Sequence, residues 1–360
     1  MYAFSFSSFR LSNFDFQTAV DIISLRLGSP NRIEAPNTQP HKLVLCNSRK
    51  LLEFRASLKE MLNFDRRSIL RILLGATAAQ TARASTTVLR VGGASIEVSL
   101  DPQGFDLPQE ALLDWVKSAA LAVTGYYGRF PVPKAGVRII SAERKGISGG
   151  RSFGNHGAQC RISVGHSTTV ADLKEDWMLT HEMVHFGFPS VPERNHWIEE
   201  GTATYVEPIA RARVGIMSIT RAWFEMVRDM PQGLPAAGDK GLDQTHTWGR
   251  TYWGGALFCL LADVGTRKRT ANGKGFEDAM RAINRAGGTI DVDWPVERAF
   301  EIGDKATGGK TLMELYEKMR SAPVMVDLPD LWKQLGVERR DGMVVFDDHA
   351  PLAAIHKSII

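Results

Sequence analysis

The chain has 360 residues, with 44 Lys and Arg, 40 Asp and Glu, and three cysteines. This length accommodates one catalytic domain with additions. The hydrophobic core of such a domain is large enough to be stable without disulfide bonds. Cys46, Cys160 and Cys259 are too widely spaced for a Cys-rich zinc site or a small disulfide framework. Cys160 and Cys259 could pair in an oxidising compartment, although two buried free thiols are the favoured interpretation.

The basic charge is concentrated near the N-terminus. Residues 1–84 hold 12 Lys and Arg and 6 Asp and Glu, so residues 85–360 hold 32 basic and 34 acidic residues. The main part of the chain is therefore not basic, which argues against nucleic acid as a partner.

Residues 61–84 have the layout of a secretion leader. The pair Arg66-Arg67 precedes a short apolar run at 69–79, and Ala-Arg-Ala at 82–84 supplies a cleavage signal. The apolar run is too short for a stable membrane span. "DRRSILR" also resembles the twin-arginine signal of bacterial exported proteins. We predict a cleavable signal peptide and an exported, periplasmic or secreted protein; the alternative is an amphipathic helix of a cytosolic domain.

Residues 1–60 have no place in front of a leader that starts at Met61. They show no sustained period of 2 or 3.6 residues and contain loose turn clusters. We predict that they are a misassigned or disordered extension.

The first part of residues 85–360 predicts a small mixed sheet. The expected elements are two strands within 86–100, a helix from Leu107 to Gly128, a strand at 136–143, a glycine-rich loop at 145–159 and a strand at 160–166. Thr169, with Asp172 as an imperfect capping box, then opens one helix that passes through His185 and ends near Gly187.

Residues 188–360 are predicted to be mainly helical. Helical periodicity covers 199–213, 219–230, 251–264, 276–285 and 312–319, and a strand followed by a short helix ends the chain. Strands first and helices later indicate an α+β fold, with the sheet and a histidine-bearing helix in 85–187. No pattern specifies an oligomeric state.

The helix before Gly187 contains the string HEMVH. On a helix, His181 and His185 lie one turn apart on one face, so both imidazoles can reach one ion. Glu182 lies about 100° round the axis, which suits a base that takes a proton from water beside the metal. The alternative for both histidines is a solvated helix face.

A third ligand is expected from the next helix. Glu199 and Glu200 follow a proline-containing turn that lets this helix run back along the first. Two imidazoles, one carboxylate and an open position suit catalytic Zn²⁺ better than magnesium or calcium, which prefer oxygen.

HEMVH followed by "WIEEGTATYVE" resembles the gluzincin peptidases, specifically the M1-type aminopeptidase superfamily and its peptidase MA-like relatives. The resemblance implies a thermolysin-like zincin fold and gives the ligand role to Glu200 rather than Glu199, which becomes a surface carboxylate or a partner of a ligand. The fourteen residues between His185 and Glu200 are fewer than the family usually has. A shorter connection still allows the second helix to run back antiparallel to the first.

A second match is "RTYWGGALFCLLADVG", which resembles a family segment whose tyrosine hydrogen-bonds the oxyanion of the tetrahedral intermediate. The match assigns that role to Tyr252 and aligns Gly255 with the family glycine. A phenol is a suitable donor to a developing oxyanion. The alternative for Tyr252 is a core aromatic residue.

One departure concerns substrate specificity. The aminopeptidases carry a G-x-M-E-N loop whose glutamate holds the free amino terminus, but residues 154–166, taken as the corresponding region, contain no acidic residue. The sequence thus predicts an exported zinc peptidase acting on peptides or proteins, with endopeptidase activity favoured. The alternatives are an M1-like aminopeptidase and a non-catalytic zinc-stabilised binding module.

Overall fold

The structure is a computed structural model that describes residues 85–360. The predictions for residues 1–60 and for the signal peptide at 61–84 lie outside the described residues. Within residues 85–360, no helix has both the length and the apolar character needed to cross a membrane.

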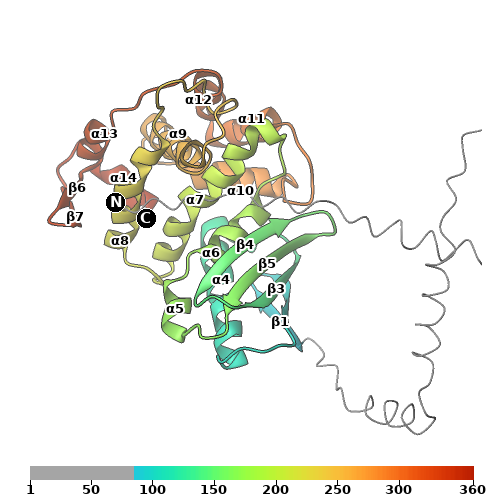
Figure 1. Ribbon diagram of the computed structural model, residues 1–360. Coiled ribbons are helices and arrows are strands. Elements are labelled where there is room, and N and C mark those ends of the chain that lie inside the picture. Colours follow the sequence, from blue (N-terminus) through green and yellow to red (C-terminus); the bar gives the residue numbers. More distant parts are fainter. Residues whose placement is uncertain (1–84) are drawn as a thin grey trace, which may run out of the picture. The chain divides into compact units, whose positions relative to one another are not determined.

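A five-stranded mixed sheet forms one end of the described part (Figure 1). The strand order is β1-β2-β3-β5-β4, with β2, β3 and β5 parallel and the two outer strands antiparallel to their neighbours. The strands are β1 (Ser85–Val91), β2 (Ala94–Leu100), β3 (Lys134–Ala142), β4 (Ile147–Phe153) and β5 (Ala158–Gly165). β4 is therefore an edge strand, and none of the strands within residues 85–360 pairs with its second side.

Alternation along the central strands separates a buried face from an exposed face. Val98, Val137 and Ile162 point into the core, whereas Glu97 and Arg161 are exposed on the opposite side. The buried face packs against helix α4 (Gln109–Tyr127), which ends at Gly128 in the left-handed conformation.

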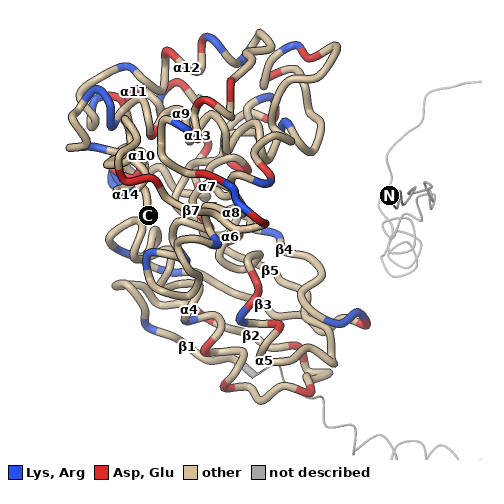
Figure 2. Tube along the Cα trace, turned by 90° about the vertical axis from the view of Figure 1, so that its left-hand side faces the viewer, with Lys and Arg blue, Asp and Glu red and all other residues tan. Residues whose placement is uncertain are grey.

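The rest of the described part is mostly helical (Figure 1). It comprises α5 (Val170–Glu175), α6 (Met178–Val184), α7 (His196–Arg213), α8 (Ile219–Asp229), α9 (Gly255–Arg269), α10 (Phe276–Arg285), α11 (Val296–Thr307), α12 (Thr311–Met319), α13 (Leu328–Leu335), β6 (Val337–Arg340), β7 (Met343–Phe346) and α14 (Ala353–Ile359). Basic and acidic residues are interspersed along this trace (Figure 2).

The predicted α+β class is confirmed, with the sheet before the helical part. The helix expected at 276–285 is α10 with the same bounds, and the two strands within 86–100 form an antiparallel pair. Helices α11 and α13 were not predicted. The strand and the short helix expected at the C-terminus are β7 and α14, whereas β6, which pairs with β7 in a hairpin, was not predicted.

The glycine-rich loop predicted at 145–159 is also wrong, since it contains β4. The glycines resemble those of a loop, but an edge strand with hydrogen bonds on one side tolerates them. Gly150 has a further reason to lack a side chain, because a Cβ there would lie 2.7 Å from Cγ of Glu182.

The single helix predicted from Thr169 to Gly187 is two helices and a short 3₁₀ turn. The Asp176 carboxylate accepts hydrogen bonds from the backbone N–H groups of Met178 and Leu179, both at 3.0 Å, and so caps the start of α6. Trp115 Nε1 also donates to Asp176, at 3.2 Å. The capping box at Thr169 and Asp172 is complete.

Cys160 and Cys259 are both buried and free. This outcome agrees with the favoured interpretation of two thiols.

Candidate metal centre

Helix α6, the 3₁₀ turn η2 (His185–Gly187) that follows it and helix α7 bring three predicted ligand side chains to one point. Glu200 Oε2 lies 3.1 Å from His181 Nε2 and 3.6 Å from His185 Nε2. One ligand atom from each of the three residues lies within 4.8 Å of the other two. The sequence spacing of four residues, from His181 on α6 to His185 at the start of the 3₁₀ turn that follows it, thus places both imidazoles toward a single carboxylate on α7.

Glu200 is fixed by a third histidine that the sequence analysis did not single out. His196 Nε2 lies 3.3 Å from Glu200 Oε1, and His196 Nδ1 lies 2.8 Å from Glu199 Oε2. Hydrogen bonds to these two carboxylates raise the pKa of His196 to about 10. Its spacing of three and four residues from the two glutamates is the sequence signal that could have identified it.

Burial by itself would raise the pKa of Glu200. Hydrogen bonds with His181, His185 and His196 outweigh burial and hold that pKa well below its usual range. Glu200 is therefore an ionised carboxylate. Its Oε2 faces the imidazoles of His181 and His185, and its Oε1 contacts His196.

Glu199 does not join the ligand cluster. Its Oε1 accepts a hydrogen bond from the Val191 N–H at 2.8 Å, and its Oε2 faces His196. It therefore ties the loop before α7 to the histidine that holds Glu200, which matches the partner role considered in the sequence.

A contact between two glycines places Tyr252 opposite Glu200. A Cβ on Gly201 of α7 would lie 2.3 Å from Cα of Gly255, and a Cβ on Gly255 would lie 2.1 Å from the Trp197 carbonyl oxygen. The helices α7 and α9 thus cross backbone against backbone at this point. Only glycine permits so close an approach.

Tyr252 lies in a π-helical turn, η5 (Arg250–Gly254), that leads into α9, where a regular α-helical start was predicted. Its ring stacks on that of His181, with a 6.2 Å centroid distance and a 25° interplanar angle. Burial, followed by the nearby Glu200 and Glu182 carboxylates, raises the pKa of Tyr252 to about 12. The phenol is therefore a neutral O–H donor at neutral pH.

Glu182 belongs to α6, and its side chain faces the edge strand β4. Ser152 on β4 donates its hydroxyl hydrogen to the Glu182 carbonyl oxygen at 2.7 Å, and Gly150 leaves space for the Glu182 side chain. Glu182 is buried but lines the same pocket as the three ligand residues.

The pocket has a volume of about 640 Å³ and runs from β4 to Tyr252. Residues 149–155 form one wall, and the carboxylates on its lining belong to Glu182, Glu199 and Glu200. His166 and His246 are not among its lining residues, and Ser141 Oγ lies 2.7 Å from His166 Nε2.

The donor atoms fit zinc. Two imidazole nitrogens and one carboxylate oxygen, converging at the wall of an open pocket, match the three-ligand sets of catalytic zinc sites. The contact from His196 to the free oxygen of Glu200 is the kind of supporting hydrogen bond that orients a metal-binding carboxylate.

Comparison with solved structures finds a shared fold in an aminopeptidase N family protein. An aminopeptidase N family protein from Idiomarina loihiensis is 12% identical, with a TM-score of 0.56 over 71% of this chain and 49% of that one. An M1 zinc metallopeptidase from Deinococcus radiodurans is 13% identical, with a TM-score of 0.44 over 69% and 53%. The chain spans about half the length of these proteins.

No protein-family model matches the chain, and a search of curated proteins finds no similar sequence. The similarity to the Idiomarina loihiensis protein shows a shared fold and supports the sequence resemblance at that level.

Proposed function

We propose that the protein is a zinc-dependent peptidase. The observation that carries this proposal is the convergence of His181, His185 and Glu200 beside Glu182, in a pocket bordered by the free edge of β4. The sequence resemblance and the fold shared with an aminopeptidase N family protein support it.

The free edge of β4 gives the substrate a place to bind. Backbone N–H and C=O groups of an unpaired edge can hydrogen-bond an extended peptide as an added strand. Gly149 and Gly150 keep this edge free of bulky side chains beside Glu182. A peptide bound there would pass next to the three ligand side chains.

The residues of the site have separate roles in hydrolysis. Bound zinc supplies polarisation of a carbonyl and a lower pKa of water. Glu182 accepts the proton of the attacking water and transfers it to the leaving amine. Tyr252 donates its phenolic hydrogen to the oxyanion that forms at the scissile carbonyl.

We infer that endopeptidase activity is favoured over aminopeptidase activity. The structure identifies β4 as the strand beside Glu182, rather than residues 154–166, and β4 also contains no acidic residue. Glu199, the remaining carboxylate in the pocket, is engaged by Val191 N–H and His196. No lining carboxylate among the described residues is therefore left to hold a substrate amino terminus.

The rival function is a non-catalytic, zinc-stabilised binding module. A purely structural zinc site has a closed fourth position and needs no base. The large open pocket and the buried Glu182 on its lining favour catalysis.

Metal removal and substrate choice test the proposal together. The zinc-loaded protein is expected to bind about one zinc per chain. It should cleave N-terminally blocked peptides, lose this activity with a chelator, and act poorly on aminoacyl fluorogenic substrates. Metal analysis and a fluorescence assay measure these properties. A metal-loaded protein that cleaves neither substrate contradicts the peptidase proposal, and efficient release of free N-terminal residues reverses the endopeptidase preference.

We also propose that the protein is exported through the signal peptide at 61–84, with Ser85 as the mature N-terminus. The leader-like layout of that segment supports this proposal. N-terminal sequencing of the protein from its native host is expected to begin near Ser85. A chain beginning near Met1 would overturn both the start site and export.

A further inference from the structure

A second pocket, of about 350 Å³, adjoins the metal centre on the side away from β4. Trp177, His181 and Tyr252 line both pockets, so the two lie side by side and share these three side chains as a common wall. The rest of the second pocket is lined mainly by residues of α7 and α8, among them Pro208 and Met226.

Aromatic side chains form the entrance to this second pocket. Trp177 is 49% exposed and Trp248 is 60% exposed, which is unusual for so large an apolar residue. Trp248 stacks on Tyr252, with ring centroids 5.5 Å apart, and Trp177 meets the edge of the His181 ring at the same separation. Two exposed tryptophans thus flank the metal ligand and the candidate oxyanion donor.

The acidic residues in the pocket are already paired with arginines. Glu207 binds the buried Arg211 at 2.8 Å, and Glu225 binds Arg221 at 3.0 Å. Asp229 is likewise bound by Arg228. Because each carboxylate has a cation, the pocket holds no unpaired charge that would select a lysine or arginine side chain.

We propose that this second pocket binds a large aromatic side chain of the peptide substrate, on a residue next to the cleaved bond. The inference rests on the proposed peptidase function, because only a peptide held at the metal centre presents a side chain there. The volume and the tryptophan walls suit an aromatic ring, which gains both apolar burial and ring stacking.

Binding to an inactive protein tests this pocket independently of catalysis. The zinc-loaded Glu182→Gln variant is titrated by calorimetry with blocked peptides that differ only in having Phe, Ala or Lys at one position. The Phe peptide is expected to bind about tenfold or more tightly than the Ala peptide, as large apolar pockets discriminate. Adding Trp248→Ala should reduce this preference severalfold, whereas Leu121→Ala, an exposed apolar position on α4, should leave it unchanged.

Cleavage mapping of a mixed peptide library by mass spectrometry supplies the second measurement. The wild-type protein should cut next to Phe, Tyr and Trp, and Trp248→Ala should lose that enrichment. Equal binding of the Phe and Ala peptides, tighter binding of the Lys peptide, or a Phe preference that survives Trp248→Ala would overturn the inference. If peptides bind with the expected preference but the wild-type protein cleaves none, the peptidase proposal fails while the pocket assignment stands.

Discussion

Replacing Glu182 with glutamine is expected to lower kcat for a blocked peptide by about 10²- to 10⁴-fold, the usual contribution of a positioned acid–base group. Glutamine keeps the shape of the side chain in the narrow space beside Gly150 but cannot accept the proton of the attacking water. Zinc content should stay near one per chain, because Glu182 is not among the clustered ligand residues. Peptide hydrolysis and metal analysis of the same preparation measure both properties.

Two further variants serve as comparisons for Glu182→Gln, one at an exposed carboxylate and one at a candidate zinc ligand. Glu193→Gln changes an exposed carboxylate in the turn before α7 and should leave both properties unchanged. Glu200→Ala removes a carboxylate that faces both ligand imidazoles and should lose zinc and activity together. Near-wild-type kcat in Glu182→Gln would rule out this residue as the base.

The cluster of candidate ligand residues was partly predictable from the sequence, because helix periodicity alone brings His181 and His185 to one face. Glu200 required the resemblance, since spacing cannot tell which of two adjacent glutamates faces the preceding helix. The structure separates them: Glu200 meets the imidazoles, whereas Glu199 faces Val191 and His196.

Other parts of the site could not be predicted, because they depend on contacts between distant segments. Trp177 and Trp248 are 71 positions apart in the chain, and only the packing of α6 and of the turn before α9 against α7 brings them to one pocket. The need for glycine at position 150 could not be predicted from the sequence for the same reason. Its missing side chain matters only because Glu182, 32 residues later, occupies the space.

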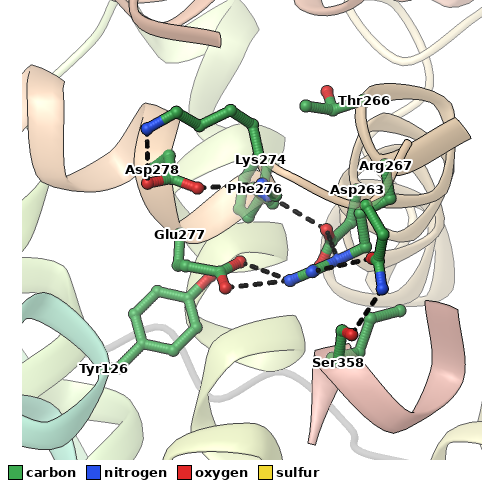
Figure 3. A network of polar contacts seen from close by, with 12 residues as sticks. Tyr126, Asp263, Thr266, Arg267, Lys274, Phe276, Glu277, Asp278 and Ser358 are labelled. Atoms are coloured by element: carbon green, nitrogen blue, oxygen red, sulfur yellow. Dashed lines mark hydrogen bonds and ion pairs between the residues drawn. The ribbon is translucent and has the colours of Figure 1, made fainter. Parts of the chain in front are cut away.

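A buried ion-pair network fixes the helices behind the site. Arg267 on α9 binds Asp263 at 2.7 Å and Glu277 of α10 at 2.8 Å (Figure 3). Asp263 also accepts hydrogen bonds from the Tyr205 hydroxyl at 2.8 Å and the Phe276 N–H at 3.0 Å. Because Tyr205 lies on α7, the network joins the helix of Glu200 to the helix that follows Tyr252.

Arg267→Met is therefore expected to lower the free energy of unfolding by about 3–5 kcal/mol, the usual cost of removing one partner of a buried pair. Asp263 is 1% exposed, and burial already raises the pKa of its carboxyl group. Without the guanidinium, Asp263 must either stay charged without this partner or take up a proton, and both outcomes cost stability even though methionine fills much of the vacated volume. Urea unfolding followed by circular dichroism measures the change, which corresponds to a fall in Tm of roughly 10 °C.

The matched control is Arg221→Met on α8, where the arginine side chain is 43% exposed and pairs with Glu225 at 3.0 Å and with Glu175 at 2.5 Å. Removing these exposed pairs should cost about 1 kcal/mol or less for each pair. The double variant Asp263→Leu with Arg267→Met should lose less stability than the two single variants together, because no charge of this pair is left buried. It should still be less stable than the wild type, since Tyr205 and the Phe276 N–H lose their acceptor. Equal effects of Arg267→Met and Arg221→Met would show that the network adds nothing beyond a surface pair.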